Sequence, residues 1–215
     1  MYDFDHGLFL ALNFDGGTFA DRMMLAVSGI AVWTPLYALI LFLVWRRDGW
    51  RGVVWFVLLL AAAMGLADIV AGIFKHNGLL GDLLPGIRPR LRPMFTPSLE
   101  GLDIAPDSLA ALRRAASPGQ WAVHVPVEAV GGRYGTVSAH AATNAALAVF
   151  SASVVRRRWL TCTVALTTLL VCYSRIYLGK HFPADILWGL LVGIALGCAA
   201  RAAYRIAVRR SGIRR

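Results

Sequence analysis

The chain contains little cysteine. Its three cysteines, Cys162, Cys172 and Cys198, all lie inside apolar runs. An odd number in such positions argues against a disulfide framework, and the spacing fits no zinc site. We therefore expect them to act as small residues that pack between helices.

The N-terminus lacks the features of a secretory signal peptide. It begins MYDFDHG, which is acidic where a signal peptide is basic, and no cleavage site follows. We expect the first long apolar run to remain in the mature protein.

Acidic residues are scarce relative to basic ones. The chain has 12 Asp and Glu against 22 Lys and Arg, which gives a formal net charge of +10. In a soluble protein this excess would suggest a nucleic-acid partner. Here the arginines cluster at the ends of apolar runs, which membrane topology explains, and no basic stripe with interleaved aromatic residues accompanies them. We expect no nucleic acid as a partner.

Apolar sequence is abundant. Hydrophobic residues make up 58% of the 215 residues, and the mean hydropathy is +0.60. Several runs reach the ~20 residues that a helix needs to cross a bilayer. The sequence therefore predicts an all-α integral membrane protein, with one domain over residues 1–215 and about five to six transmembrane helices. The expected spans are residues 23–45, 53–74, 137–155, 159–177 and 184–200.

Two segments differ from these spans. Residues 1–22 are mixed in character and predict an interfacial helix with Leu8, Phe9 and Leu12 on its apolar side. Residues 75–137 are rich in proline and charge and predict a long extracytoplasmic loop, with an insertion at 94–136 and a short helix at 106–116. Loops of this length are often functional.

The distribution of arginine predicts an orientation. With five spans, residues 46–51, residues 156–158 and the C-terminal tail share one side, and they carry three, three and six arginines with Asp48 as their only acid. By the positive-inside rule that side is cytoplasmic. The N-terminus, the 75–137 loop and residues 174–185 are then expected to face the periplasm or the exterior.

The last span contains a repeat of small residues. Gly189, Gly193 and Gly197 recur every four residues, a spacing that lets another helix approach closely. Packing within the chain is the favoured interpretation, and a homodimer face through the same three glycines is the alternative.

The stretch from Ser174 to Asp185, SRIYLGKHFPAD, carries the strongest chemical signal. Arg175 offers a planar fork of donors for a phosphate oxyanion, and His181 can act as nucleophile, base or acid near neutral pH. If a helix begins near Pro183, Asp185 faces back toward His181 and can hold one ring nitrogen. The alternative is a cationic loop at the membrane edge, including Lys180, that only caps a helix.

Two further stretches are expected on the same membrane face. One holds Lys75 and the segment IRPRLRP, which contains Arg88, Arg90 and Arg92, and the other holds Ser138 and His140. Such a cationic pocket with two histidines suits an anion with a leaving group, since lysine and arginine stabilise phosphoryl oxygens. One histidine can attack phosphorus while the other protonates the departing oxygen. Asp68 precedes Lys75 by seven residues on the same helix face and either orients the lysine or packs helices.

A metal site is the competing interpretation of the same residues. His140, His181 and Asp185, with or without His124, offer ligands of the right chemistry. The surrounding Lys and Arg charges would repel a cation, and no HExxH spacing is present. We therefore expect no metal.

These stretches together resemble the type 2 phosphatidic acid phosphatase superfamily, whose motifs read K-x6-RP, PSGH and SR-x5-H-x3-D. The third motif matches in full from Ser174 to Asp185. The second appears as VSAH at 137–140, with Val137 and Ala139 in place of proline and glycine. The first is stretched, because 16 residues instead of six separate Lys75 from the Arg92-Pro93 pair.

The resemblance implies a role for each matched residue. His181 would be the nucleophile that forms a phosphohistidine, Asp185 would orient it, and His140 would protonate the leaving group and later activate water. The residues implied to hold the phosphate are Lys75, Arg92, Ser138 and Arg175, with Arg88, Arg90 and Ala139 as further candidates. No metal or cofactor is implied.

The resemblance also implies a substrate class, a phosphorylated lipid in a bacterial inner membrane. Undecaprenyl diphosphate, the 1-phosphate of lipid A, phosphatidylglycerophosphate and phosphatidic acid all fit. The 94–136 insertion is the expected source of selectivity, through Trp121, His124, Glu128 and Arg133. The alternatives are a lipid phosphotransferase on the same site and a non-catalytic lipid transporter or scaffold.

Overall fold

The computed structural model describes residues 2–96 and 123–211, and within them every regular element is helical. The one β feature in this part of the chain is an isolated antiparallel bridge between Leu91 and Tyr134. The main helices are α1 (Tyr2–Leu12), α2 (Gly17–Ser28), α3 (Thr34–Lys75), α5 (Ala139–Val155), α6 (Arg158–Tyr177) and α7 (Pro183–Arg210). Short 3-10 turns cover Ala31–Trp33, Pro93–Phe95 and Val127–Ala129.

Within residues 2–96 and 123–211, three helical stretches are long and apolar enough to cross a membrane, namely Ala31–Lys75, Arg158–Tyr177 and Pro183–Arg210. The expectation of an all-α membrane protein is therefore confirmed. The last helix is about ten residues longer than the 184–200 span expected. The short helix expected at 106–116 lies outside the described residues.

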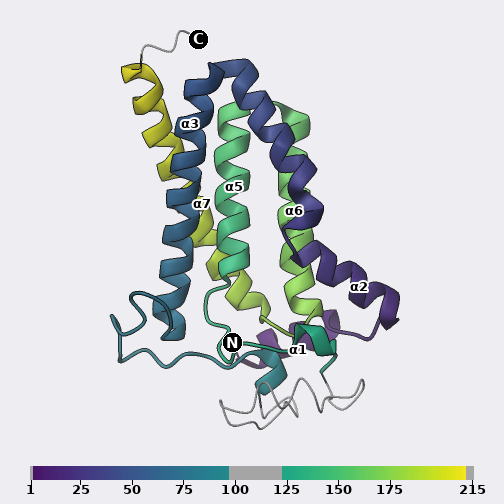
Figure 1. Cartoon of the computed structure of the whole chain (residues 1–215). Helices are drawn as coiled ribbons and strands as arrows, with labels where there is room; N and C mark the ends of the chain where they lie inside the picture. The colour runs from purple at the N-terminus through teal and green to yellow at the C-terminus, as the bar shows by residue number, and fades with distance from the viewer. Residues whose placement is uncertain (1, 97–122, 212–215) are drawn as a thin grey trace.

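Helix α3 is folded into two arms at Gly49. Gly49 has φ 68° and ψ −174°, a backbone conformation that glycine adopts without strain. One arm leads from the end of α2 to the bend and the other descends beside α7, so the two run in opposite directions (Figure 1). They correspond to the spans expected at 23–45 and 53–74.

The first of those expected spans was placed wrongly. Residues 23–45 do not form one helix, because α2 ends at Ser28 and Gly29 is extended, with φ −85° and ψ 163°. Helix α3 then begins anew at Thr34, with Pro35 in its first turn, where a missing N–H costs no hydrogen bond.

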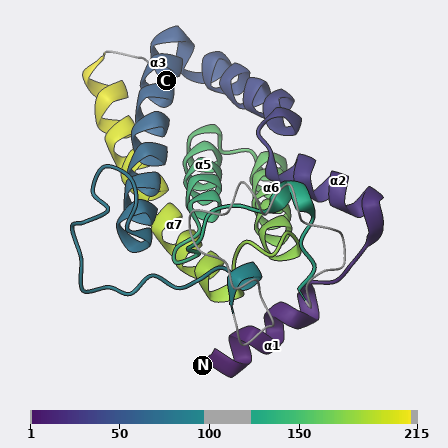
Figure 2. The same ribbon diagram turned by 60° about the horizontal axis from the view of Figure 1, so that its bottom comes forward.

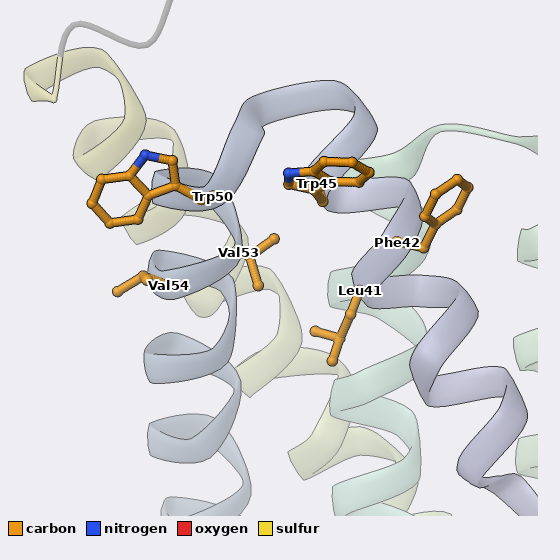
Figure 3. Close-up of a pocket in the computed structure, with 6 residues that line it drawn as sticks. All are labelled: Leu41, Phe42, Trp45, Trp50, Val53 and Val54. Atoms are coloured by element: carbon orange, nitrogen blue, oxygen red, sulfur yellow. The ribbon is translucent and has the colours of Figure 1, made fainter.

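A notch of about 460 Å³ separates the two arms of α3 near the Gly49 bend. Figure 3 shows its lining, which is hydrophobic and comprises Leu41, Phe42, Trp45, Trp50, Val53 and Val54. The notch lies at the opposite end of the bundle from the first turn of α5 (Figure 1). Its hydrophobic lining, with no ionisable side chain in it, fits contact with lipid rather than chemistry.

Helix α5 forms the centre of the bundle, with α6 on one side and α3 and α7 on the other (Figure 2). Its contact with α7 depends on the glycine repeat. A Cβ on Gly189 would lie 2.5 Å from the Ser138 carbonyl oxygen, and one on Gly197 would lie 2.9 Å from that of Ala146. All three glycines are buried against α5 of the same chain, which confirms the favoured interpretation of packing within the chain.

Replacing Gly193 by valine is expected to separate α5 from α7. The new Cβ would collide with the Ala142 carbonyl oxygen and lie 2.7 Å from the Ala145 Cβ. We expect the free energy of unfolding in detergent to fall by about 3 kcal/mol, as for other overpacked cores. Ala195→Val, on the outer face of the same helix, is the matched control. Equal unfolding midpoints for the two variants would contradict this packing.

The N-terminal segment forms two helices rather than the single interfacial helix expected over residues 1–22. Helices α1 and α2 are separated at Asn13, whose side-chain amide donates to the carbonyls of Ile176 (3.1 Å) and Tyr177 (2.8 Å). Phe9 is buried, whereas Leu8 is partly exposed, so the apolar side of α1 was assigned only in part.

The cysteines also differ from expectation. Cys172 is buried between helices, but Cys162 and Cys198 are exposed on the outer faces of α6 and α7. The prediction of helix-packing cysteines therefore holds for Cys172 alone.

Candidate active site

One end of the bundle collects the functional candidates. Helix α3 ends there at Lys75, α5 begins there after Ser138, α6 ends there and α7 begins there (Figure 1). The Gly49 bend and the C-terminal end of α7 lie at the opposite end. Three segments far apart in sequence are thereby brought to a common site.

His181 lies in the tight connection between α6 and α7. Gly179 has φ 64°, and the backbone N–H groups of Lys180 and His181 both donate to the Arg175 carbonyl, at 3.0 and 3.3 Å. The His181 side chain is almost fully buried. Its Nδ1 lies 2.9 Å from the Gly135 carbonyl oxygen, which can only accept, so Nδ1 carries the proton. The lone pair is then on Nε2, which leaves that nitrogen unprotonated.

Asp185 lies close to this ring without bonding directly to it. Its Oδ2 is 3.8 Å from His181 Nδ1 and accepts from the Phe182 backbone N–H at 3.0 Å. The hydrogen bond expected from Asp185 to the imidazole is made instead by Gly135. Asp185 therefore lies beside His181 and stabilises the start of α7.

Two arginines, the buried Arg175 and the partly buried Arg92, border the histidine. Arg175, on the last turn of α6, contacts the Ser28 hydroxyl through Nη1, and its Nε is buried with no partner among the described residues. Arg92 donates from Nε to the Tyr134 carbonyl at 3.1 Å and from Nη1 to that of Gly131. Both guanidinium groups are thus held by the protein in fixed orientations.

The electrostatics of the site indicate an anion. Burial lowers the pKa of His181 well below the usual 6.5, and nearby positive charges lower it further. Those charges belong to Arg92, Arg175 and Lys75. Burial also lowers the pKa of Arg92 to about 10, against the opposing effect of the Asp185 carboxylate. Three cations gathered with one carboxylate leave excess positive charge, which a phosphate neutralises.

We expect the His181 ring to remain neutral at pH 5.5, because its pKa is lowered. A histidine with the ordinary pKa of ~6.5 would then be mostly protonated. The unfolded chain takes up this proton as the pH falls through ~6.5 while the folded chain does not, so folding stability decreases over that range. Nitrogen NMR of ring-labelled histidine, assigned with His181→Ala, reports the ring state. An imidazolium signal from His181 at pH 5.5 would contradict the description.

Ser138 and His140 occupy the start of α5. Ser138 is fully buried and caps the helix, its Oγ accepting from the Ala141 N–H at 3.4 Å, while its own N–H donates to the Asp185 carbonyl at 3.0 Å. Val137 has φ 55°, a strained conformation for a β-branched residue. This strain occurs where the second motif departs from its usual proline.

His140 is the second residue of α5, and its side chain lines a cavity of about 230 Å³. The charges of Arg175 and His181 act on its ring, so all three side chains belong to the same end of the bundle. Asp68 lines the same cavity and lies near enough to Lys75 for their charges to interact. The remaining lining comes from the turn after α2, both arms of α3, and α5 and α6.

The arginines of IRPRLRP separate into different roles. Arg88 is exposed, whereas Arg92 acts on His181 directly through its charge. Arg90 pairs with Asp5 at 2.5 Å and lies 3.9 Å from Asp185. Of the three arginines, Arg92 is the one whose charge acts on His181, which agrees with its choice from the sequence.

The other candidates lie elsewhere. His124 pairs with Asp21 at 2.8 Å and packs edge-on to Tyr177, with ring centroids 5.0 Å apart, so it belongs to the α1–α2 junction. Arg133 lies over the Tyr134 ring, at 5.8 Å. Trp121 lies outside the described residues.

Sequence reasoning missed three contributors to the site. The Gly135 carbonyl, the Ser28 hydroxyl and the Asp5 carboxylate all contact site residues or their neighbours. None carries a motif signal, because a backbone carbonyl and two isolated polar residues look ordinary in sequence.

Comparison with known proteins agrees with this site. The model of the PAP2 superfamily matches residues 56–209, which contain Lys75, Arg92, His140 and the whole 174–185 stretch. The chain belongs to the PAP2 superfamily. It is a membrane lipid phosphatase of this family, as the sequence predicted.

Individual relatives extend the comparison. A lipid A 4'-phosphatase of Bacteroides thetaiotaomicron is 29% identical over 193 residues, covering 90% of this chain and 73% of that protein. A lipid A 4'-phosphatase of Porphyromonas gingivalis is 42% identical over 67 residues, covering 31% of this chain and 28% of that protein. The crystal structure of a PAP2-type phosphatidylglycerolphosphate phosphatase from Bacillus subtilis superposes with a TM-score of 0.59 at 18% identity, covering 95% of this chain and 86% of that one.

Proposed function

We propose that this membrane lipid phosphatase hydrolyses a phosphate monoester of a lipid of the lipid A type, through a phosphohistidine on His181. The observation that carries the mechanism is the hydrogen bond from His181 Nδ1 to the Gly135 carbonyl, which leaves Nε2 unprotonated. The lowered pKa of His181 supports it, since a neutral imidazole is the nucleophilic form.

The chemistry follows in two displacements at phosphorus. The Nε2 lone pair of His181 forms a bond to phosphorus as the P–O bond to the lipid breaks, and His140 gives its proton to the departing lipid oxygen. A water molecule then attacks the phosphohistidine, loses a proton to His140 and releases phosphate and neutral His181. Lys75, Arg92 and Arg175 stabilise the negative charge on the equatorial oxygens in both steps.

The cavity beside His140 supports a substrate with a hydroxylated headgroup. Trp33 and Tyr37 supply aromatic surface, while Asp68, Thr143 and Asn144 supply hydrogen-bonding groups. Aromatic faces with a few placed polar groups suit a sugar ring better than a prenyl chain. The named activities of the two bacterial relatives favour the 4′-phosphate of lipid A over the 1-phosphate that the sequence suggested.

Undecaprenyl diphosphate is the second candidate. It is favoured by the three cations that act on His181, because a diphosphate carries more negative charge than a monoester.

A phosphotransferase on the same site would pass the phosphoryl group from His181 to a lipid hydroxyl instead of water.

The orientation proposed is with the site facing the periplasm or exterior of a bacterial inner membrane. Its support is the arginine-rich Gly49 bend, 156–158 turn and α7 end, which gather at the end of the bundle away from the site (Figure 1).

Phosphate release from purified protein in detergent tests the proposal, with EDTA present throughout. The panel is 4′- and 1-phosphorylated lipid A, undecaprenyl diphosphate, phosphatidylglycerophosphate and phosphatidic acid. We expect EDTA-resistant release, fastest from the 4′-phosphorylated lipid A and absent in His181→Ala. Faster release from undecaprenyl diphosphate would overturn the substrate assignment. Phosphate that appears on an acceptor lipid instead of in solution would establish transfer.

A further inference from the structure

The N-terminal helix α1 contacts the catalytic helix α7 through one buried carboxylate. Asp5 Oδ1 accepts from the Ala184 backbone N–H at 2.9 Å, in the first turn of α7. Asp5 Oδ2 pairs with Arg90 Nη1 at 2.5 Å. One side chain from the start of the sequence thus binds both the residue before Asp185 and a residue of the IRPRLRP segment.

Arg90 in turn packs against the catalytic connection. Its guanidinium carbon lies 3.6 Å from the centroid of the Phe182 ring, and Phe182 directly follows the nucleophile. Its Nη1 lies 3.9 Å from Asp185 Oδ1. The His6 ring of α1 stacks on the same phenyl ring, with centroids 4.8 Å apart. The backbone between His181 and Asp185 is therefore held by α1 and Arg90 together.

The backbone of Arg90 also fixes the carbonyl that orients the nucleophile. The Arg90 carbonyl accepts from the Gly135 N–H at 2.9 Å, and the Arg90 N–H donates to the Thr136 hydroxyl at 2.7 Å. The Gly135 carbonyl then accepts from His181 Nδ1 at 2.9 Å. A continuous series of contacts joins Asp5, Arg90, Gly135 and His181.

We propose that Asp5 and Arg90 form a positioning pair that holds His181 and the start of α7 in the reactive geometry. The inference rests on the proposed role of His181 as nucleophile. Arg90 donates to Asp5 and faces Asp185, so its charge is used within the protein and not on the phosphate. Asp5 also lies outside the residues that the family model matches.

Burial makes this pair sensitive to substitution. The side chains of Arg90 and Asp5 are 18% and 9% exposed, so solvent screens their interaction far less than a surface pair. Removing one partner leaves the other charge buried without its counter-ion, and such a group moves or recruits water. Either response displaces Phe182 and Gly135, and small displacements at a reacting centre cost up to about 10²-fold in rate.

The test compares Asp5→Asn, Arg90→Gln and the double variant, with the exposed Asp82→Asn as control. Asparagine keeps an oxygen for the Ala184 N–H and loses the charge that Arg90 needs. We expect each single variant to lower kcat by about 10- to 100-fold with KM changed by less than about threefold. Because both act through one pair, the double variant should be no slower than the slower single variant.

Three outcomes would overturn the positioning role. A kcat of Asp5→Asn equal to that of the Asp82→Asn control would exclude it. A kcat of the double variant reduced by the product of the two single-variant losses would exclude it too. A rise in KM for Arg90→Gln at unchanged kcat would make Arg90 a phosphate ligand instead. If Asp5→Asn does not fold, Arg90→Lys replaces it, since lysine keeps the ion pair and must recover kcat above that of Arg90→Gln.

Failure of the underlying mechanism would look different. In that case the wild-type protein itself would show no phosphohistidine at His181 after rapid quenching with substrate. Normal phosphohistidine in the wild type, together with unimpaired Asp5→Asn, would reject the positioning pair alone.

Discussion

Replacing His181 by alanine is expected to abolish phosphate release, with kcat falling by about 10⁴-fold or more. The side chain is buried, its Nδ1 is held by Gly135, and no other nitrogen occupies the place of Nε2 among the described residues. The variant should still fold, since alanine keeps the backbone hydrogen bonds of the connection.

His140→Ala should behave differently with an aryl phosphate. Such a substrate has a leaving group that departs without a proton, so His181 can still be phosphorylated while water is no longer activated. A rapid-quench experiment should show phosphoenzyme accumulating in His140→Ala and none in His181→Ala. His124→Gln is the control, because His124 pairs with Asp21 away from the site. Equal phosphoenzyme in the two alanine variants would contradict the assignment of roles.

Replacing Arg175 by lysine is expected to lower kcat/KM by about 10²- to 10³-fold. The Arg175 guanidinium is buried with one nitrogen bound to Ser28 and its Nε unpartnered among the residues described, so it presents a fixed donor to the site. An ammonium group cannot contact Ser28 and supply that second donor together. Steady-state kinetics and inhibition by inorganic vanadate measure the effect on the reaction and on oxyanion binding.

Arg88→Lys provides the comparison for this prediction. Its side chain is exposed, and Arg92 occupies the site in its stead. The two lysine variants should therefore differ by at least about tenfold in kcat/KM. Similar losses in both would contradict the distinction between buried and exposed arginines.

Much of the fold was predictable, because the lengths of the apolar runs and the positions of the arginines indicate where the helices lie and where they end. The runs ending at Arg46 and Arg156 mark helix ends that the structure reproduces within a few residues. The break at Gly29 was not predictable, because the apolar run continues through it. The only local signal of a new helix is that Gly29 is followed six residues later by Pro35, which lies in the first turn of α3. Periodicity describes a helix and says little about where it bends.

The partner of the glycine repeat could not be read from its spacing. A stripe of small residues shows that some helix approaches closely, and any helix of the same or another chain satisfies it. The structure assigns it to α5, where the Ala142 and Ala146 carbonyls lie against Gly193 and Gly197.

The site was predictable where it is local and obscure where it depends on long-range contacts. His181 and Asp185 lie four residues apart on one short motif, so their proximity follows from helix geometry. The choice of Arg92 depends on the Leu91–Tyr134 bridge and the Arg92 N–H bond to the Arg133 carbonyl. Those pairings join segments some forty residues apart, and no spacing rule specifies them.

The most direct test of the central claim is to locate the phosphoryl group during turnover. The wild-type protein is mixed with phosphate-labelled substrate, quenched in alkali, digested and sequenced by mass spectrometry. Our account predicts an acid-labile, alkali-stable phosphoryl group on His181 alone, formed within one turnover and absent in His181→Ala. Label on another residue, or turnover that passes through no covalent phosphoenzyme, would contradict it.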